Sequence, residues 1–480
     1  MAKVSVKSKE ISRVEELVLK GNYKQAAQLI EHMPEVTDLR AAAIKAHVLI
    51  YQGRLDEAEE VLEPHGDKIH DEANLKDTAE FGLAKAEWLY WRGEYEAAEK
   101  QLQNVLGIYR IKGDLFGQAR GLSLLGRVYR RQGNYDLAKK HLEEALEAIQ
   151  TQTDVKETDF LLGRILFNLG VIHHQLGELD QAESLYTKGM KLLKQTEKGR
   201  YYAGVLNSYG MLLRAKGKYE QAARCYQEAI NYFSESASFD DLAHTTNNLA
   251  YAQIRLGNLA AAAELLMEGL ELRRRARDIG GESATLEFMG LLHFEQGHLK
   301  EAQQTLNSAI QLAELAKNDQ EKAFALITLG RVLAAQDALD ESKEKLDEAL
   351  RLAIQLKSKM LECESSTYLA EVHARKGDGV GAYEHLQRAK SLMNGYTDAY
   401  LKTQIERIEN LLKEEKIKTA GGVFMIKSSF LPTWREAHDS LGKFLLTEAL
   451  QHSEGSQVRA AELLGVTKAY ITMLRRKHNV

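Results

Sequence analysis

A six-residue motif, Gly217-Lys218-Tyr219-Glu220-Gln221-Ala222, recurs in near-copies along almost the whole chain. Each copy has a glycine, then Tyr or Leu two residues later, and Ala five residues after the glycine. The glycines are Gly21, Gly53, Gly93, Gly133, Gly177, Gly217, Gly257 and Gly297, followed by weaker copies at Asp337 and Gly377. From Gly53 onward the spacing is 40 residues at every step except one of 44, between Gly133 and Gly177. A fixed period in this range is typical of a solenoid, in which each unit buries its apolar face against its neighbours.

The repeat between residues 201 and 234 predicts two antiparallel helices. Apolar residues fall at helical spacing on both sides of Gly217: Leu206, Tyr209 and Leu213 before it, and Ala222, Tyr226 and Ala229 after it. Gly217 is placed to end the first helix, because glycine adopts the left-handed conformation without steric cost. Small residues such as Gly210 let the two helices approach closely. We therefore expect an all-α fold of about ten helix pairs.

This pattern resembles the tetratricopeptide repeat (TPR). The best copies are Leu122/Leu125/Gly126 with Ala138/Leu142/Ala145, and Leu166/Leu169/Gly170 with Ala182/Tyr186. The family usually repeats every ~34 residues, and a longer step resembles its long-helix branch, found in kinesin light chains and bacterial peptide-sensing regulators. The resemblance covers residues 10–412 and implies a right-handed superhelix whose groove binds a peptide or protein partner.

Composition agrees with a helical chain. Only three prolines occur in 480 residues, so helix breakers are scarce. Residues 1–18 lack the apolar core of a signal peptide, and no run approaches the ~18 apolar residues of a membrane span. We expect a cytoplasmic protein of bacterial type with no membrane contact. The formal charge of −5 is uneven, because residues 455–480 carry a local +4 and residues 1–454 carry −9.

The chain is expected to divide into three parts. Residues 1–412 form the solenoid, with 1–78 as an irregular N-terminal cap containing Pro34 and Pro64. The extra residues before Gly177 fit in the polar stretch 151–159 as a longer loop. Residues 413–430 form a linker, beginning with a charged run and continuing through Gly421 and Gly422. Residues 431–480 form a small separate domain.

The last fifty residues predict a helix, a glycine turn and a second helix. Ala461 is small where the two helices cross, Gly465 makes the turn and Thr467 caps the last helix. Val466, Ile471 and Leu474 are expected in the core, as the sequence shows them at helical spacing.

Residues 455–477 resemble the Fis-type helix-turn-helix, found in Fis itself and in enhancer-binding activators of the nitrogen-regulation type. The shared features are Gly-x-Gln-x-x-Ala-Ala-x-x-Leu-Gly-Val and a basic last helix; the chain departs from the family at residues 469–472, which puts the base preference in doubt. The resemblance implies binding to double-stranded DNA through Arg459, Thr467, Lys468, Tyr470, Thr472, Arg475, Arg476 and Lys477. Fis-type modules pair through the preceding helix, which here carries Leu441, Phe444, Leu445 and Ala449. The resemblance therefore also implies a homodimer that reads half-sites about 34 Å apart.

The inner face of the solenoid is the second candidate site. In TPR superhelices the first helix of each pair lines the groove, which by register gives these candidates for binding a peptide or protein partner: Arg127, Arg130, Arg131, Arg164, Asn168, Asn207, Arg214, Asn247 and Tyr251. Asparagine is unfavourable inside a helix, and its carboxamide can both donate to and accept from a peptide backbone. The asparagines could instead bond neighbouring repeats. The arginines would favour a carboxylate or an acidic segment, or they could be ordinary solvated charges.

The motifs of catalysis are missing from the sequence. It has no phosphate-binding Gly-x-x-x-x-Gly-Lys-Ser/Thr loop, no His-Glu-x-x-His, no Gly-x-Ser-x-Gly and no Cys-x-x-Cys. We expect no enzyme activity, no cofactor and no metal site. Two hypotheses remain. One is a DNA-binding transcriptional regulator whose solenoid binds a peptide or protein partner. The solenoid then either controls the C-terminal domain or recruits the partner to it. The alternative is a scaffold or adaptor protein with a structural helical tail.

Overall fold

The computed structural model describes residues 2–19, 23–31, 38–65, 74–150, 158–195, 199–235, 239–393, 398–413, 418–420, 423–425, 434–453, 455–464 and 466–478. The chain divides into two compact units, Met1–Tyr368 with Ala389–Thr403, and Leu369–Arg388 with Gln404–Val480. The boundary expected after residue 412 therefore lies inside the second unit. None of the helices in the described ranges is long and apolar enough to cross a membrane.

Four helices form the N-terminal cap: α1 (Ala2–Leu19), α2 (Tyr23–Ile30), α3 (Leu39–Tyr51) and α4 (Leu55–Leu62). Two of them, α2 and α4, have only eight residues each, so the cap is irregular as the sequence predicts. Asp38 caps α3, because its carboxylate accepts a hydrogen bond from the Ala41 N–H at 2.8 Å. Pro34 lies outside the described residues.

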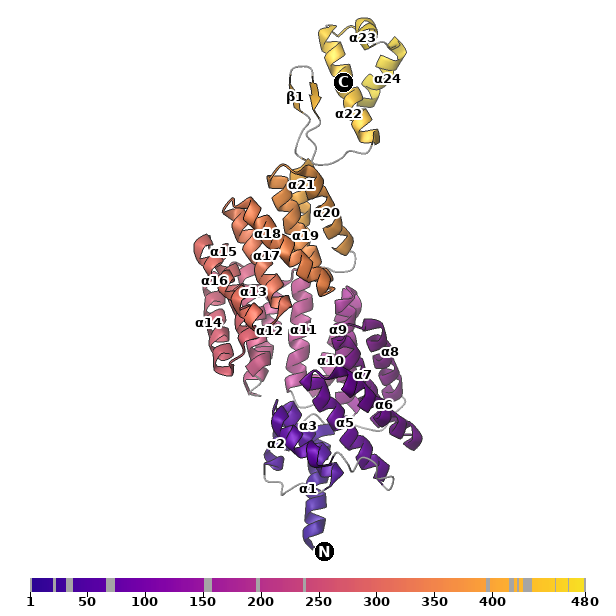
Figure 1. Cartoon of the computed structure of the whole chain (residues 1–480). Helices are drawn as coiled ribbons and strands as arrows, with labels where there is room; N and C mark the ends of the chain where they lie inside the picture. Colours follow the sequence, from indigo (N-terminus) through magenta and orange to yellow (C-terminus); the bar gives the residue numbers. More distant parts are fainter. Residues whose placement is uncertain are drawn as a thin grey trace. The chain divides into compact units, whose positions relative to one another are not determined.

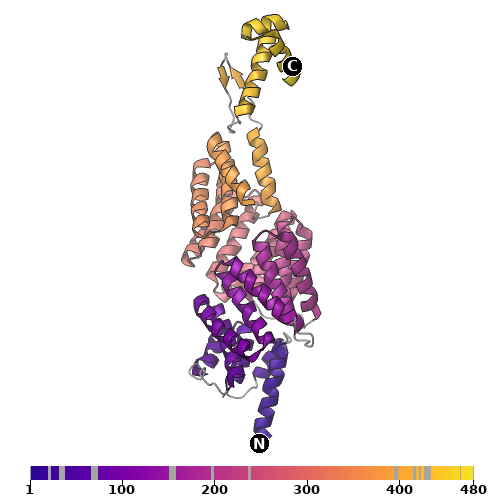
Figure 2. The same cartoon turned by 90° about the vertical axis from the view of Figure 1, so that its right-hand side faces the viewer.

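Regular helix pairs follow the cap (Figure 1). They are α5 (Leu75–Arg92) with α6 (Tyr95–Lys112), α7 (Leu115–Arg131) with α8 (Tyr135–Gln150), α9 (Thr158–Gln175) with α10 (Leu179–Gln195), α11 (Arg200–Ala215) with α12 (Tyr219–Glu235), α13 (Phe239–Arg255) with α14 (Leu259–Ala276), α15 (Ile279–Glu295) with α16 (Leu299–Leu315), α17 (Asp319–Ala335) with α18 (Leu339–Gln355), and α19 (Lys359–Arg375) with α20 (Gly379–Met393). The connection from α8 to α9 is longer than the others, as the sequence predicts, although residues 151–157 themselves lie outside the described ranges. Figure 2 shows the paired helices from a second direction.

The turn inside each pair follows from the repeated glycine. Gly217 has φ of 72°, its N–H donates to the Arg214 carbonyl at 2.8 Å, and the Lys218 N–H donates to the Leu213 carbonyl at 2.8 Å. This geometry satisfies carbonyl groups left over at the end of a helix. Asp337 adopts the same left-handed conformation, with φ of 65°, where the repeat lacks its glycine.

The close approach of the two helices in a pair also follows from the sequence. A Cβ atom added to Gly210 would lie 2.6 Å from Cε1 of Tyr226, a fully buried residue of the partner helix. Gly330 meets Leu346 in the same way. The glycine of the first helix therefore receives a large side chain of the second, and the interior is close-packed.

The first helices of successive pairs pack on one another, from α5 through α17. We call the face that these first helices share the inner face. The cap reaches across it to a distant repeat: the Arg200 N–H donates to the Tyr51 hydroxyl at 3.0 Å, and the Tyr23 ring lies 6.3 Å from the ring of Tyr201. The sequence does not predict this contact, because nothing in the repeat specifies how far the solenoid turns.

Beyond the repeats, α21 (Ala399–Lys413) precedes a short hairpin of β1 (Lys418–Ala420) and β2 (Val423–Met425). The strands are antiparallel, with Thr419 opposite Phe424. The repeats are all-α as expected, and the hairpin lies within residues 413–430, the segment expected to be a linker. Val423 and Phe424 suit strands, because β-branched and aromatic residues are enriched there.

Three helices end the chain: α22 (Trp434–His452), α23 (Gln457–Leu464) and α24 (Lys468–His478) (Figure 1). They share a core of Leu446, Ala449, Leu450, Ala460, Ala461, Ile471 and Leu474, with Val466 packed against it. The predicted core positions Val466, Ile471 and Leu474 are thus confirmed. Thr467 caps α24 as expected, because its hydroxyl accepts from the Tyr470 N–H at 3.2 Å. Gly465 lies outside the described residues.

Candidate functional site

A pocket of about 640 Å³ lies on the inner face, between the cap and helices α5 to α13. Six of the residues predicted from the repeat register line it together: Arg127, Arg130, Arg131, Arg164, Asn168 and Asn207. They come from the first helices α7, α9 and α11, whose inner-face sides the repeat brings together. Its size is within the usual range for ligand pockets, about 300–1,000 Å³.

Three other predicted residues do not line this pocket. Asn247 is only 3% exposed, and its amide donates to the Thr285 hydroxyl at 3.0 Å. Successive helix residues point about 100° apart, so Asn247 turns toward the next pair while its neighbour Asn248 faces Asn207. The Arg214 guanidinium lies over the Tyr251 ring, 5.0 Å from its centre.

Aromatic rings hold the arginine side chains of the pocket. The Arg127 guanidinium lies 4.4 Å from the centre of the Tyr90 ring, and the Arg164 guanidinium lies 4.3 Å from that of Tyr201. Cation–π contacts of this kind are worth ~0.5–2 kcal/mol and restrict the guanidinium to one plane. Nε of Arg130 and Nε of Arg164 are both buried and have no hydrogen-bond partner within the protein. Both N–H groups therefore remain available to a ligand.

Glu87 neutralises part of this positive charge. Its carboxylate lies 2.8 Å from Nδ1 of His47 and 3.5 Å from Nη1 of Arg127. Burial alone would raise the pKa of Glu87, but the hydrogen bond with His47 and the nearby arginines hold it well below its usual value. Glu87 is not among the residues predicted from the sequence, although it occupies the position of Arg127 one repeat earlier, six residues before the turn glycine.

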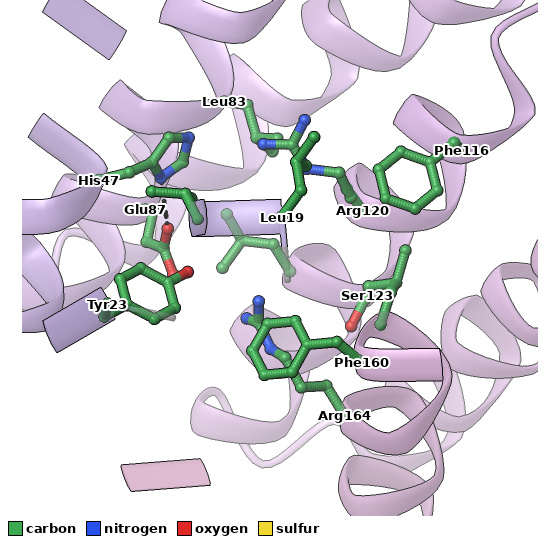
Figure 3. A pocket seen from close by; sticks show the side chains of 13 residues that line it. Leu19, Tyr23, His47, Leu83, Glu87, Phe116, Arg120, Ser123, Phe160 and Arg164 are labelled. Carbon is green, nitrogen blue, oxygen red and sulfur yellow. Dashed lines mark hydrogen bonds and ion pairs between the residues drawn. The ribbon is translucent and has the colours of Figure 1, made fainter. Parts of the chain in front are cut away.

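A smaller cavity of about 50 Å³ adjoins the pocket and shares Tyr23, His47, Glu87 and Arg164 with it. Figure 3 shows the hydrogen-bonded His47 and Glu87 facing this cavity, with Tyr23 next to Glu87 and with Phe160 and Arg164 close to each other. The cap therefore contributes to the walls of both cavities.

The arginines also act on Tyr90, which is 4% exposed. Burial by itself would raise the pKa of Tyr90, but the charges of Arg127, Arg131 and Arg130 outweigh it and lower the pKa to about 7. A phenolate stabilised in this way indicates a strongly positive pocket.

We expect Tyr90 to titrate in the neutral range, well below an ordinary tyrosine. The ultraviolet phenolate band of the full-length protein should rise through a midpoint of about pH 7, and the Tyr90→Phe variant should lack this step. Tyr135→Phe, at a tyrosine of α8 that does not line the pocket, is the matched control and should keep it. Identical titrations of wild type and Tyr90→Phe across the neutral range would contradict the expectation.

The two pocket asparagines each keep part of their hydrogen-bonding capacity. Asn168 donates to the Arg164 carbonyl at 2.9 Å, which leaves its carbonyl oxygen as an acceptor. Asn207 accepts from Asn248 at 3.1 Å, which leaves its amide N–H groups as donors. One donor and one acceptor, side by side along the inner face, match the polar groups of a peptide backbone.

The C-terminal candidates lie mostly on the surface of the three-helix unit. Arg459, Thr467, Lys468, Arg476 and Lys477 are exposed, and Tyr470 is 40% exposed. Thr472 and Arg475 are partly buried, and the Thr472 hydroxyl donates to the Gln457 side chain at 3.0 Å. The expected outward face is therefore present, with Thr472 engaged in a contact between α23 and α24.

Sequence comparisons give the repeats their family. Models of the tetratricopeptide repeat match residues 39–64, 79–151 and 123–189, and a model of the MalT-like TPR region matches residues 209–414. Regulatory protein RapG of Bacillus subtilis (strain 168) is 21% identical over 214 residues, which are 42% of this chain. The match spans 57% of that relative's own length.

Comparison with solved structures supports the same fold. The apo form of the quorum sensor NprR from B. thuringiensis matches with a TM-score of 0.54 at 16% identity, covering 73% of this chain and 99% of that one. A Rap protein complexed with Competence and Sporulation Factor matches with a TM-score of 0.57 at 15% identity, covering 76% and 99%. The chain therefore carries tetratricopeptide repeats, arranged in a helical solenoid similar to those of Rap proteins and NprR.

Proposed function

We propose that this chain is a regulatory protein whose inner face binds a peptide or an extended segment of a protein partner. The observation that carries the proposal is the pocket of about 640 Å³ in which Asn168 and Asn207 retain unused hydrogen-bonding groups beside a row of arginines. Polar groups that are nearly buried and only partly satisfied gain most from a ligand that completes their hydrogen bonds. Asn248, which does not line the pocket, uses its amide within the stack and donates to the Asn207 carbonyl oxygen at 3.1 Å.

The proteins of similar fold agree with this proposal. One is named a quorum sensor, another was solved in complex with Competence and Sporulation Factor, and RapG is named a regulatory protein. Sensing and regulation in such proteins support a receptor role here. Identity is low, so the ligand itself must be argued from the residues of this chain.

The test is a direct search for peptide ligands of the full-length protein. Immobilised protein is presented with a library of random octapeptides, and retained peptides are identified by mass spectrometry. Asn168→Ala/Asn207→Ala should weaken the binding of retained peptides about 5- to 150-fold, because each hydrogen bond contributes about 0.5–1.5 kcal/mol. Asn104→Ala is the matched control, since Asn104 is exposed on α6 and does not line the pocket. Failure to retain any peptide, or equal affinities for the double variant and the control, would contradict the proposal.

DNA binding by the C-terminal helices is the second candidate function. It is supported by the exposed basic residues Lys468, Arg476 and Lys477 on α24, above a core that fixes this helix against α22 and α23. Exposed cations on one helix suit contacts with phosphates and base edges. The peptide-binding solenoid would then control the DNA-binding tail or recruit a partner to it. The alternative is a scaffold or adaptor protein in which the solenoid makes the protein–protein contacts and the helical tail is structural.

A homodimer through α22 belongs to the same proposal. Leu445 is 42% exposed on this helix, whereas Ala449 is buried within the three-helix core. Only part of the expected apolar surface is therefore open to a second copy. Light scattering should give twice the chain mass, and a strict monomer with and without DNA would remove the dimer.

A further inference from the structure

The small cavity beside the inner-face pocket is lined by polar groups that the fold leaves unsatisfied. We call it the cap cavity, and its polar walls are Tyr23, His47, Glu87, Arg120, Ser123 and Arg164. Nε2 of His47, Oγ of Ser123 and Nε of Arg164 are buried and have no hydrogen-bond partner among the described residues. His47 is only 7% exposed and Ser123 only 2%. Because buried polar groups are normally paired, three unpaired groups around one cavity point to a ligand that pairs them.

These three groups include donors as well as an acceptor. Burial opposes ionisation of Glu87, but His47 and the nearby arginines hold its pKa well below the usual value, so its carboxylate can only accept. Nδ1–H of His47 therefore donates to Glu87 at 2.8 Å, which leaves Nε2 of the neutral ring as an acceptor. Nε–H of Arg164 is a donor, and the Ser123 hydroxyl can act in either way. A ligand group that satisfies this cavity must both donate and accept.

The size of the cap cavity limits the ligand group to a short side chain. Its volume is about 50 Å³, which gives room for about three to five atoms the size of a water molecule. Pockets that hold a whole ligand are larger, about 300–1,000 Å³. The cavity adjoins the inner-face pocket, because Tyr23, His47, Glu87 and Arg164 line both. A short side chain can therefore occupy the cavity while the rest of its peptide lies in the pocket.

The other walls and the charges narrow the choice further. Leu83 of α5, Phe116 of α7 and Phe160 of α9 supply apolar surface (Figure 3). The carboxylate of Glu87 and the guanidinium of Arg164 both line the cavity, so a side chain of either charge would meet a like charge there. The cavity therefore suits a short, uncharged side chain with one polar group and one apolar group.

We infer that the cap cavity binds a hydroxyl-bearing side chain of the peptide ligand, threonine in preference to serine. This inference rests on the proposed function and specifies one residue of its ligand. The hydroxyl both donates to and accepts from the unpaired groups of the cavity, and the methyl group of threonine contacts the apolar walls. Valine has almost the same shape but no hydroxyl, so it would leave the buried polar groups unpaired.

The experiment begins with random hexapeptides that the full-length protein retains in an affinity selection. The retained peptides should share a hydroxyl residue at one position, in most of them threonine. Replacing this threonine by valine in a synthetic peptide should weaken binding at least ~10-fold, since a site built to bond a hydroxyl rejects an analogue without it. Serine at the same position should weaken binding less than valine does.

Ser123→Ala tests the cavity separately from the larger pocket, because Ser123 lines only the cavity. This variant should bind the threonine peptide about 2- to 10-fold more weakly than the wild type does, and the valine peptide equally well. Ser208→Ala is the matched control, since Ser208 of α11 lines the pocket and not the cavity, and it should keep the wild-type preference. Without peptide, Ser123→Ala should unfold at no lower temperature than the wild type, because its hydroxyl has no hydrogen bond to lose.

The outcomes separate this inference from the proposed function. If the retained peptides share no hydroxyl residue, or if threonine and valine peptides bind equally, the inference falls and peptide binding stands. A preference for aspartate or asparagine at the shared position overturns it too, because the cavity then takes another class of side chain. Equal preferences of Ser123→Ala and Ser208→Ala, or a lower thermal midpoint of Ser123→Ala, would show that the Ser123 hydroxyl does not serve a ligand. If the folded protein retains no peptide, both the inference and the proposed function fall.

Discussion

Replacing Glu87 by glutamine is expected to lower the free energy of unfolding by about 3 kcal/mol, because it leaves buried positive charge without its carboxylate. The Glu87 side chain is 14% exposed and the Arg127 side chain 8%. Among the described residues, Glu87 is the only one whose carboxylate lies at ion-pair distance from Arg127, and the same carboxylate is hydrogen-bonded to His47. Denaturation of the full-length protein in urea, followed by circular dichroism, measures the change.

Asp56→Asn is the matched control for this variant. Asp56 pairs with Arg92 at 3.3 Å, but its side chain is 92% exposed, so solvent screens the pair and little change is expected. If Glu87→Gln and Asp56→Asn unfold at the same urea concentration, the buried network does not stabilise the fold.

The Glu87 contribution should depend on pH in a defined direction. The pKa of Glu87 is held below its usual value of 4.5 in the folded protein. Its stabilisation is therefore fully present above pH 4.5 and is lost as the pH falls through the lower, folded-state value. The difference between wild type and Glu87→Gln should accordingly shrink in acid, since protonated Glu87 resembles glutamine.

The sequence predicted the solenoid because each local signal agrees with the others. The glycine at Gly217 ends one helix, and Gly210 leaves room for Tyr226 of the next helix. The same register correctly brought Arg127 and Asn168 to one pocket, although they lie in different repeats. A period repeated this often determines which face of each helix is inside, and that is enough to place side chains.

The repeat pattern does not predict the contacts between residues that lie far apart in the sequence. The contact of Tyr51 with Arg200 and the insertion of Tyr400 beside Arg255 depend on the accumulated rotation from one pair to the next. A small change per repeat would bring different residues together, and no motif in the sequence encodes that angle. Asn247 does not line the pocket although it stands at the same repeat position as Asn207, ten residues before the turn glycine, and its amide donates instead to Thr285 of the next pair.

The C-terminal helices lead to the second large effect. If α24 binds DNA, Lys468→Ala should weaken binding to the preferred sequence about 5- to 150-fold, the loss expected when a side chain near a base edge is removed at a cost of about 1–3 kcal/mol. Arg476→Ala should instead weaken binding to all sequences and lower the slope of log K against log salt concentration by about one, as expected for a phosphate contact. Lys468 and Arg476 are both exposed. Arg475 is partly buried, so its replacement would change the stability of the three-helix unit as well as its affinity for DNA.

The measurement uses the full-length protein and a pool of random duplex DNA, enriched by repeated selection and followed by titration at several salt concentrations. Lys188→Ala provides the control, because it removes the same charge from an exposed site on α10 of the solenoid. If only the loss of positive charge matters, Lys188→Ala and Lys468→Ala should weaken DNA binding equally. If α24 is a recognition helix, only Lys468→Ala should lose the preference for one DNA sequence. If no sequence is enriched, and Lys468→Ala/Arg476→Ala retains DNA as well as wild type at low salt, the tail is structural. The adaptor function would then account for the whole chain, with the inner-face pocket as its binding site.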